Sequence, residues 1–221
     1  MSYRKYPILP EEIYHVFNRS IAHQPIFLEE KDCQRFLETI NFYRFAPTPL
    51  RFSFYNRLAK QEKVVFMEKL QKEGKKQVAI FSFCLMPNHF HFLMKELTEE
   101  GIRKFASNLQ NSYAKYFNTK RKRTGSLFQE MFKAVRIETD EQFIHAARYI
   151  HLNPYSSIIV KNLEQLKSYT WCSLGDYLEE KHFDFLEKDF LISFFKTKKA
   201  FKNFTFNQAD YQKHLEEIKH L

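Results

Sequence analysis

Two histidines, His89 and His91, occupy alternate positions of an apolar segment that has the composition of a β-strand. Because successive side chains of a strand point to opposite faces, both imidazoles leave the same face and can converge on one divalent cation. Two partly exposed sheet histidines without a ligand would show the same spacing. The pair by itself therefore leaves a metal site and an ordinary sheet surface both open.

A tyrosine and an asparagine form a second pair of residues whose side chains could take part in catalysis or metal binding. Tyr149 and Asn153 are one helical turn apart in a segment with helical periodicity, so the phenol and the amide carbonyl share one helical face. A core aromatic residue followed by a helix C-cap before Pro154 would give the same pattern. This pair, too, leaves both interpretations open.

Positive charge is concentrated in one part of the chain. Residues 103–136 contain nine Lys and Arg residues and one Glu, a net charge of +8, whereas the whole chain carries +9. Aromatic residues are interleaved with these cations, a combination that suits phosphate contacts and base stacking. We therefore expect a nucleic-acid partner. The candidate DNA contacts in this segment are Lys115, Lys120, Arg121, Lys122, Arg123, Lys133 and Arg136, and Arg19 near the start of the chain is a further candidate.

Periodicity and turn residues predict the elements that position these side chains. Strands are expected at residues 13–17, 77–86, 89–94 and 132–137, and helices at 30–43, 99–120, 141–152, 173–178 and 207–220. In the second strand, Phe81, Phe83 and Leu85 are expected on one face. The helix at 141–152 is expected to begin after an Asp140 N-cap and to end before Asn153 and Pro154.

Composition narrows the class of protein. With 221 residues, 44% hydrophobic residues and only 4 Gly, the chain is expected to fold around a sizeable core. Its three cysteines, Cys33, Cys84 and Cys172, are widely spaced, which argues against a disulfide framework or a zinc knuckle and favours a reducing cytoplasm. No apolar run approaches the length of a membrane span, so no membrane partner is expected.

Several motifs, in order, resemble the single-tyrosine HUH transposases of the IS200-like family, and within them the REP-associated tyrosine transposase branch. The motifs are Tyr14-His15-Val16-Phe17-Asn18-Arg19, Cys84 to Leu93 with Pro87-Asn88-His89-Phe90-His91, Ser112 to Asn118, Gly125-Ser126-Leu127-Phe128-Gln129, Tyr149-Ile150-His151-Leu152-Asn153-Pro154 and Tyr169 to Ser173. The resemblance covers roughly residues 10–160. Met131 stands where the family pattern commonly has Arg, and residues 45–76 look like an insertion.

The resemblance implies an α+β fold, with a ferredoxin-like or RRM-like antiparallel sheet and packed helices. It implies a transposase domain at residues 8–160, with the insertion at about 45–76, and a small helical extension at 161–221. By similarity, His89, His91 and Asn153 hold a divalent metal ion, Mg or Mn, and Tyr149 is the catalytic nucleophile. The implied reaction cleaves and rejoins single-stranded or hairpin DNA through a 5′-phosphotyrosine intermediate. The implied protein is a monomer or a homodimer.

Three alternatives bear on this interpretation. Tyr113 and Tyr116 are rival nucleophiles, but their partners one turn later, Phe117 and Lys120, cannot ligate a cation. A domesticated, non-catalytic nucleic-acid-binding protein could retain the same sheet and basic surface. A metal phosphoesterase with a water nucleophile would account for the two histidines but would form no protein adduct.

Overall fold

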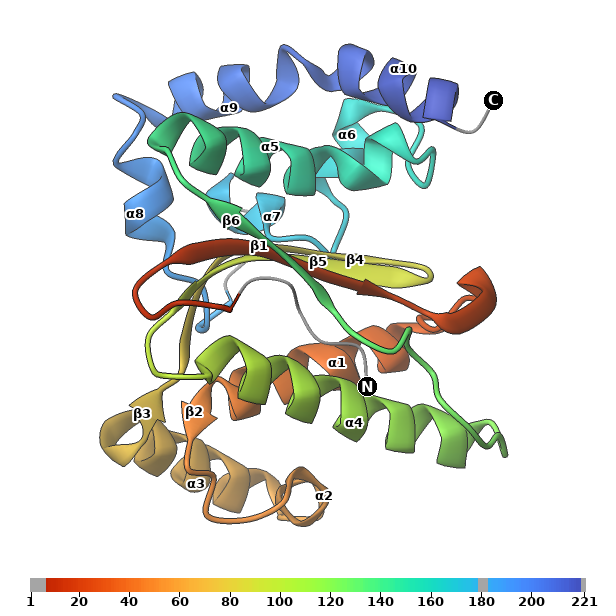
Figure 1. Cartoon of the computed structure of the whole chain (residues 1–221), viewed down its shortest axis with the longest axis vertical. Helices are drawn as coiled ribbons and strands as arrows, with labels where there is room; N and C mark the ends of the chain where they lie inside the picture. Colours follow the sequence, from red (N-terminus) through yellow and green to blue (C-terminus); the bar gives the residue numbers. More distant parts are fainter. Residues whose placement is uncertain (1–6, 179–182, 220–221) are drawn as a thin grey trace.

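The computed structural model describes residues 7–178 and 183–219. It is an α+β protein in which a four-stranded antiparallel sheet packs against helices, so the predicted fold class is confirmed (Figure 1). The strands are β1 (Ile13–Arg19), β2 (Phe45–Ala46), β3 (Lys75–Lys76), β4 (Val78–Met86), β5 (His89–Glu96) and β6 (Lys133–Ile137). The helices are the 3₁₀ turn η1 (Ile21–His23), α1 (Glu30–Tyr43), α2 (Phe52–Tyr55), α3 (Lys60–Glu73), α4 (Gly101–Lys120), α5 (Asp140–Ser156), α6 (Leu163–Lys167), α7 (Leu174–Tyr177), α8 (Lys188–Ile192), α9 (Lys198–Phe206) and α10 (Ala209–Lys219).

The main sheet has the strand order β4-β5-β1-β6, with every neighbouring pair antiparallel. Its strands and the two crossover helices follow the order β1-α1-β4-β5-α4-β6, which is the βαββαβ arrangement of ferredoxin-like folds. A two-residue turn at Pro87 and Asn88 joins β4 to β5. The sheet thus places β5, which carries both histidines, directly beside β1.

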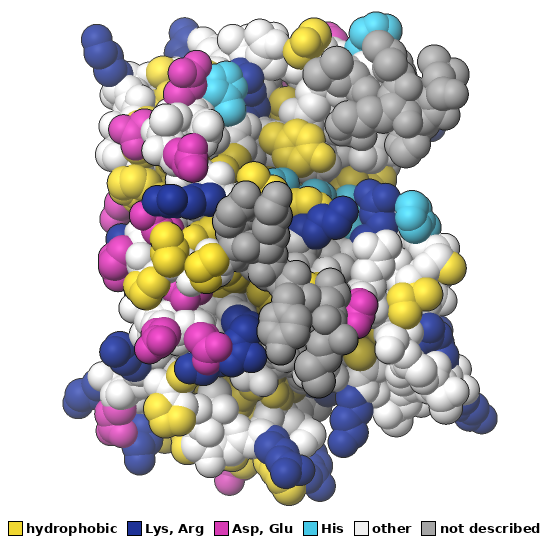
Figure 2. Space-filling model, in the orientation of Figure 1, with side chains coloured by type: hydrophobic (Ala, Val, Ile, Leu, Met, Phe, Trp, Pro, Cys, Tyr) yellow, Lys and Arg dark blue, Asp and Glu magenta, His cyan; other side chains and the backbone are white. Residues whose placement is uncertain are grey.

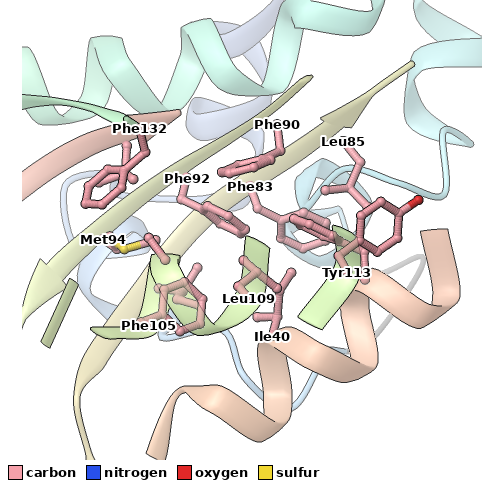
Figure 3. Close-up of a cluster of buried hydrophobic side chains, with 14 of the residues drawn as sticks. Ile40, Phe83, Leu85, Phe90, Phe92, Met94, Phe105, Leu109, Tyr113 and Phe132 are labelled. Atoms are coloured by element: carbon pink, nitrogen blue, oxygen red, sulfur yellow. The ribbon is translucent and has the colours of Figure 1, made fainter. Parts of the chain in front are cut away.

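One face of the sheet is covered by α1 and α4 (Figure 1). Alternate side chains of the central strands point into this layer because successive strand residues face opposite ways. Phenylalanines supply much of its volume, as Figure 3 shows for Phe83, Phe90, Phe92 and Phe105. Tyr113 of α4 also lies in this core, fully buried.

The opposite face is covered by α5 and by parts of the chain that follow it, while α9 and α10 lie on the outer side of α5 (Figure 1). A β-bulge between Ile80 and Ser82 shifts the register of β4 against β5. The prediction that Phe81 shares a face with Phe83 and Leu85 is therefore wrong. Phe81 instead packs against Phe143 of α5, with ring centroids 5.2 Å apart, because the extra residue turns it to this side.

The boundaries of α5 also differ from the prediction. The N-cap is Thr139, whose hydroxyl accepts a hydrogen bond from the backbone N–H of Gln142, and Asp140 is the first helical residue. The helix continues through Asn153 and Pro154 to Ser156. A proline has no backbone N–H to donate to a helical hydrogen bond, and helices usually end at or before the residue that precedes it. The prediction therefore ends this helix before Asn153. In the structure, Asn153 lies on the same continuous helix as Tyr149.

The segments outside the βαββαβ core form two additions. Residues of the predicted insertion form a small hydrophobic core with Phe42 of α1, in which Phe45, Phe52 and Leu70 are also buried. The chain after α5 adds α6 to α10, and α9 and α10 lie along α5 (Figure 1). The division at residue 160 stays a prediction. Among the described residues, none of the helices is both long and apolar enough to cross a bilayer.

Candidate active site

A cavity of about 620 Å³ lies where β1, β5 and β6 meet α5. It brings together six residues that the sequence singled out, from four separate elements: Arg19, His89, His91, Lys133, Tyr149 and Asn153. Figure 2 shows histidine side chains in the hollow at the middle of the molecule, with Lys or Arg side chains beside them. The cavity is therefore polar, basic and open to solvent on one side.

The sheet register explains why the histidines meet the cavity. In the β1–β5 pair, Arg19 lies opposite His89 and Phe17 lies opposite His91. Cross-strand partners share a face, so all four side chains point toward α5. The ring centroids of His89 and His91 are 4.9 Å apart, with the rings nearly perpendicular. The predicted convergence of the two imidazoles is thus present in the fold.

Tyr149 approaches the histidines from α5. Its ring meets that of His91 edge-on, with centroids 5.9 Å apart and an interplanar angle of 87°. Asn153 lies one turn later on the same helical face, and its side-chain amide donates a hydrogen bond of 3.0 Å to the carbonyl of Tyr149. The amide nitrogen is thereby engaged, which leaves the oxygen, Oδ1, as the atom with which Asn153 can bind a ligand.

Hydrogen bonds engage the Nδ1 atom of each histidine of the pair. His89 Nδ1 lies 2.6 Å from Asn88 Oδ1, while Asn88 Nδ2 donates to the backbone carbonyl of His23. His91 Nδ1 lies 2.9 Å from Nε2 of His15. His91 Nε2 is buried and has no hydrogen-bond partner among the described residues. Such an orphaned nitrogen at a cavity wall is the donor that a metal ion requires.

These donors fit a divalent metal ion. Two imidazole nitrogens and one amide oxygen would hold the cation from one side and leave positions open for other ligands. Within the described residues, no cluster of three or more His, Cys, Asp or Glu side chains suits a metal ion. His89, His91 and Asn153 do not count as such a cluster, because the third donor is an asparagine.

Burial keeps the histidines of the site neutral. Desolvation lowers the pKa of His15 and of His89 to about 4, with the charge of Arg19 adding to the effect at His89. The pKa of His91 is lowered well below its ordinary value, first by burial and then by His15 and His89. Neutral imidazoles are the form that binds metal ions.

We expect the metal-free protein to lose stability as pH falls below about 6.5. The unfolded chain takes up protons at the ordinary histidine pKa, whereas the folded chain resists them until about pH 4. His151, buried and bonded through Nε2 to Ser173 Oγ, acts in the same direction because its pKa is lowered to about 3. Each histidine contributes a slope of at most about 1.4 kcal/mol per pH unit in this window.

Urea unfolding in chelator between pH 7.5 and pH 5 would measure this slope. A flat profile in the wild-type protein would contradict the burial of neutral histidines.

The C-terminal helix α10 fixes the backbone beneath Tyr149. The side-chain amide of Gln212 donates to the carbonyl of Tyr149 at 3.1 Å and to Ser156 Oγ at 3.2 Å. Near the end of α5, the hydroxyl of Tyr155 donates to a carboxylate oxygen of Asp210. The helix that presents the phenol is therefore held on both sides, by the sheet and by α10.

The remaining basic candidates lie outside the cavity. Lys120 and Arg121, at the end of α4, pair with Glu29 and with the buried carboxylate of Asp32 on α1. Arg136 pairs with Glu12, and Arg123 bonds to Asn118 and to the carbonyl of Ser126. Lys115 and Lys122 are exposed and make no ion pair with any described residue. As DNA contacts, these residues stay a prediction.

The rival tyrosines lie on the other side of the sheet. Tyr113 is buried in the core beneath the sheet and donates to the carbonyl of Ile26, and burial raises its pKa far above the ordinary value. Tyr116 donates to Asp32. Both hydroxyls are thus used to join α4 to the segment around α1, away from the histidines.

Sequence reasoning missed His15 as a residue of the site. Its ring lies 5.1 Å from that of His91 and 5.8 Å from that of Tyr149, centroid to centroid. The available signal was its position in β1, where it shares the sheet face of Phe17 and Arg19. A single histidine in an alternating strand is a weak signal, and only the strand order β5-β1 places it beside His91.

A family model described as "Transposase IS200 like" matches residues 51–153, a little under half of the chain. This segment is similar to the IS200-like transposases. The IS200-like segment contains both histidines, Tyr149 and Asn153, whereas β1 with Arg19 and His15 precedes it. The resemblance noted from the motifs is thereby confirmed for the wider family.

The fold is similar to a solved structure titled "Structure of the REP associates tyrosine transposase bound to a REP hairpin". The TM-score is 0.51 at 11% sequence identity, and the match covers 85% of this chain and 98% of the other. At that identity the likeness concerns the fold alone. No curated protein gives a significant match.

Proposed function

We propose that the protein is a metal-dependent single-tyrosine transposase of the REP-associated branch, which cleaves and rejoins single-stranded or hairpin DNA. The observation that carries the proposal is the meeting of Tyr149 with His89, His91 and Asn153 in one basic cavity. The family match and the hairpin bound by the structurally similar transposase support DNA as the substrate.

Tyr149 would perform the covalent step. Its phenolic oxygen attacks the phosphorus of a phosphodiester, so that a tyrosine–phosphorus bond forms while the bond from phosphorus to the 3′ oxygen breaks. The phenolic proton passes to solvent, and the departing oxygen takes up a proton to become a 3′-hydroxyl. Because one phosphodiester replaces another, the reverse step with a second 3′-hydroxyl rejoins DNA without ATP.

The surrounding residues would orient the phosphate and balance its charge. Arg19 and Lys133 lie on the cavity wall opposite α5, where guanidinium and ammonium groups can neutralise a phosphodiester. His89, His91 and Asn153 would hold Mg or Mn. When bound there, the cation supplies positive charge to a phosphoryl oxygen, as a Lewis acid does. The hydrogen bonds from Asn153 and Gln212 to the carbonyl of Tyr149 keep the phenol in place.

An adduct assay tests the proposal. The protein is incubated with end-labelled hairpin oligonucleotides that carry single-stranded flanks, in Mn²⁺ or in EDTA, and is resolved on a denaturing gel. We expect a labelled protein band only with the metal. Salt-sensitive binding without such a band, across varied hairpins, would contradict the catalytic proposal and favour a non-catalytic DNA-binding protein. Product release without an adduct would favour a water nucleophile.

The cationic residues of the cavity should determine the salt dependence of DNA binding. We expect Arg19→Gln and Lys133→Gln each to lower the slope of log affinity against log salt by about 0.7 to 0.9, the loss of one phosphate contact. Lys69→Gln, on α3 far from the cavity, should leave the slope unchanged. Fluorescence anisotropy between 50 and about 300 mM salt measures the slopes. Equal slopes for all four proteins would contradict the placement of DNA in this cavity.

A further inference from the structure

His15 lies at the centre of the candidate site without a role in the proposed reaction. It occupies the middle of β1, and its ring stacks beside that of His91 at an interplanar angle of 25°. His15 Nε2 is 2.9 Å from His91 Nδ1, and the rings of His15 and Tyr149 meet in a T-shaped arrangement. It thus contacts both a candidate metal ligand and the candidate nucleophile.

We propose that His15 is a positioning residue that fixes the tautomer and the ring orientation of His91, so that the lone pair of His91 Nε2 faces the cavity. The inference rests on the proposed function, because it gives His91 Nε2 the role of a metal donor. It adds a residue that binds no cation itself and acts through its hydrogen bond to His91.

The hydrogen-bond inventory determines where the ring hydrogens lie. A neutral imidazole has one N–H and one lone pair, and the pattern must suit the partner of each nitrogen. His91 Nε2 is buried with no partner among the described residues, so an N–H there would be a donor without an acceptor. The hydrogen of His91 therefore belongs on Nδ1, from which it is donated to Nε2 of His15. The hydrogen of His15 must then lie on its Nδ1.

The strand register of the sheet places His15 beside His91. In the β1–β5 register, His15 lies opposite Leu93 and Phe17 lies opposite His91, so His15 and Phe17 are successive residues on the face that His91 shares. Their rings lie 5.1 and 5.5 Å from that of His91, centroid to centroid. Because His91 is only 5% exposed, bulk water cannot replace the acceptor that His15 provides. A metal-ligating histidine commonly has its second nitrogen fixed in this way, although by a carboxylate, carbonyl or water.

Two substitutions separate the hydrogen bond from the packing. His15→Leu fills the space and removes the acceptor, whereas His15→Gln restores an oxygen acceptor at a similar reach. Val135→Thr is the matched control, because Val135 is the partner of His15 on β6 and is largely exposed. Mn²⁺ affinity of the full chain is measured by calorimetry, and thermal unfolding checks that each variant folds.

We expect His15→Leu to weaken Mn²⁺ binding by about 10- to 100-fold, and His15→Gln and Val135→Thr to stay within about threefold of wild type. Equal affinity in wild type and a folded His15→Leu, or equal losses in the Gln and Leu variants, would overturn the role of His15. A wild-type protein that binds no Mn²⁺ would instead contradict the proposed metal site and, with it, this role.

Imidazole ¹⁵N NMR of the metal-free wild-type protein gives a readout that needs no variant and no activity. We expect the Nδ1-protonated form of His91 to predominate, with a non-protonated Nε2. In His15→Leu we expect a mixture of both tautomers. A His91 that carries its hydrogen on Nε2 in the wild-type protein would overturn the proposal.

Discussion

Tyr149→Phe should abolish the protein–DNA adduct while leaving DNA and metal binding within about threefold of wild type. The substitution removes only the phenolic oxygen, and the ring keeps its edge-on contact with His91. No other tyrosine on the cavity wall can replace it among the described lining residues. We expect adduct formation to fall by at least about 10³-fold, the scale at which loss of a nucleophile reduces covalent catalysis.

Tyr116→Phe is the matched control for this experiment. It removes a phenolic oxygen from the same protein, but that oxygen bonds to Asp32 on the far side of the sheet. The variant should form the adduct at the wild-type rate, at a cost of about 1 kcal/mol in stability. Loss of the adduct in Tyr116→Phe, or its persistence in Tyr149→Phe, would reverse the assignment of the nucleophile.

His91→Leu should eliminate metal binding but leave the stability of the metal-free protein almost unchanged. The buried Nε2 of His91 has no partner among the described residues, so a leucine of similar size removes a buried polar atom that folding leaves unsatisfied. The lost bond to His15 acts in the opposite direction. We therefore expect the free energy of unfolding, without metal, to stay within about 1 kcal/mol of wild type.

Metal-dependent stabilisation is the measurement that reveals the difference. A ligand at 100 times its Kd stabilises the folded state by about 2.7 kcal/mol, which corresponds to a rise in Tm of about 5–10 °C for a chain of this size. We expect this rise in the wild-type protein and not in His91→Leu. His145→Gln, an exposed histidine on α5, is the control and should show the wild-type rise. An equal rise in His91→Leu would contradict its role as a ligand.

The sheet and its histidine face could be predicted because strand alternation is a local property. His89 and His91 leave the same face of any strand that contains them both, and the apolar residues around them define that strand. The single extra residue of the bulge at Phe81 could not be foreseen, since every residue of β4 is buried and alternation gives no signal there. Register shifts depend on the partner strand rather than on the segment itself.

The site was predictable only in part. Tyr149 and Asn153 share a helical face by spacing alone, but the prediction that the helix ends before Asn153 followed a general rule for proline that α5 overrides. In α5, the C-terminal turn is held by Ser157 N–H to Asn153 and by Gln212 from α10. Such long-range support, like the contact between His15 and His91, arises from the assembled fold.

The central claim is that Tyr149 becomes covalently attached to DNA. The most direct test is mass spectrometry of the adduct formed with a short hairpin oligonucleotide and Mn²⁺, after nuclease and protease digestion. We predict a nucleotide phosphate on the peptide that contains Tyr149, and none when EDTA is present. A nucleotide phosphate on a residue other than Tyr149 would contradict this claim. So would DNA that is cleaved by water, with no modified peptide.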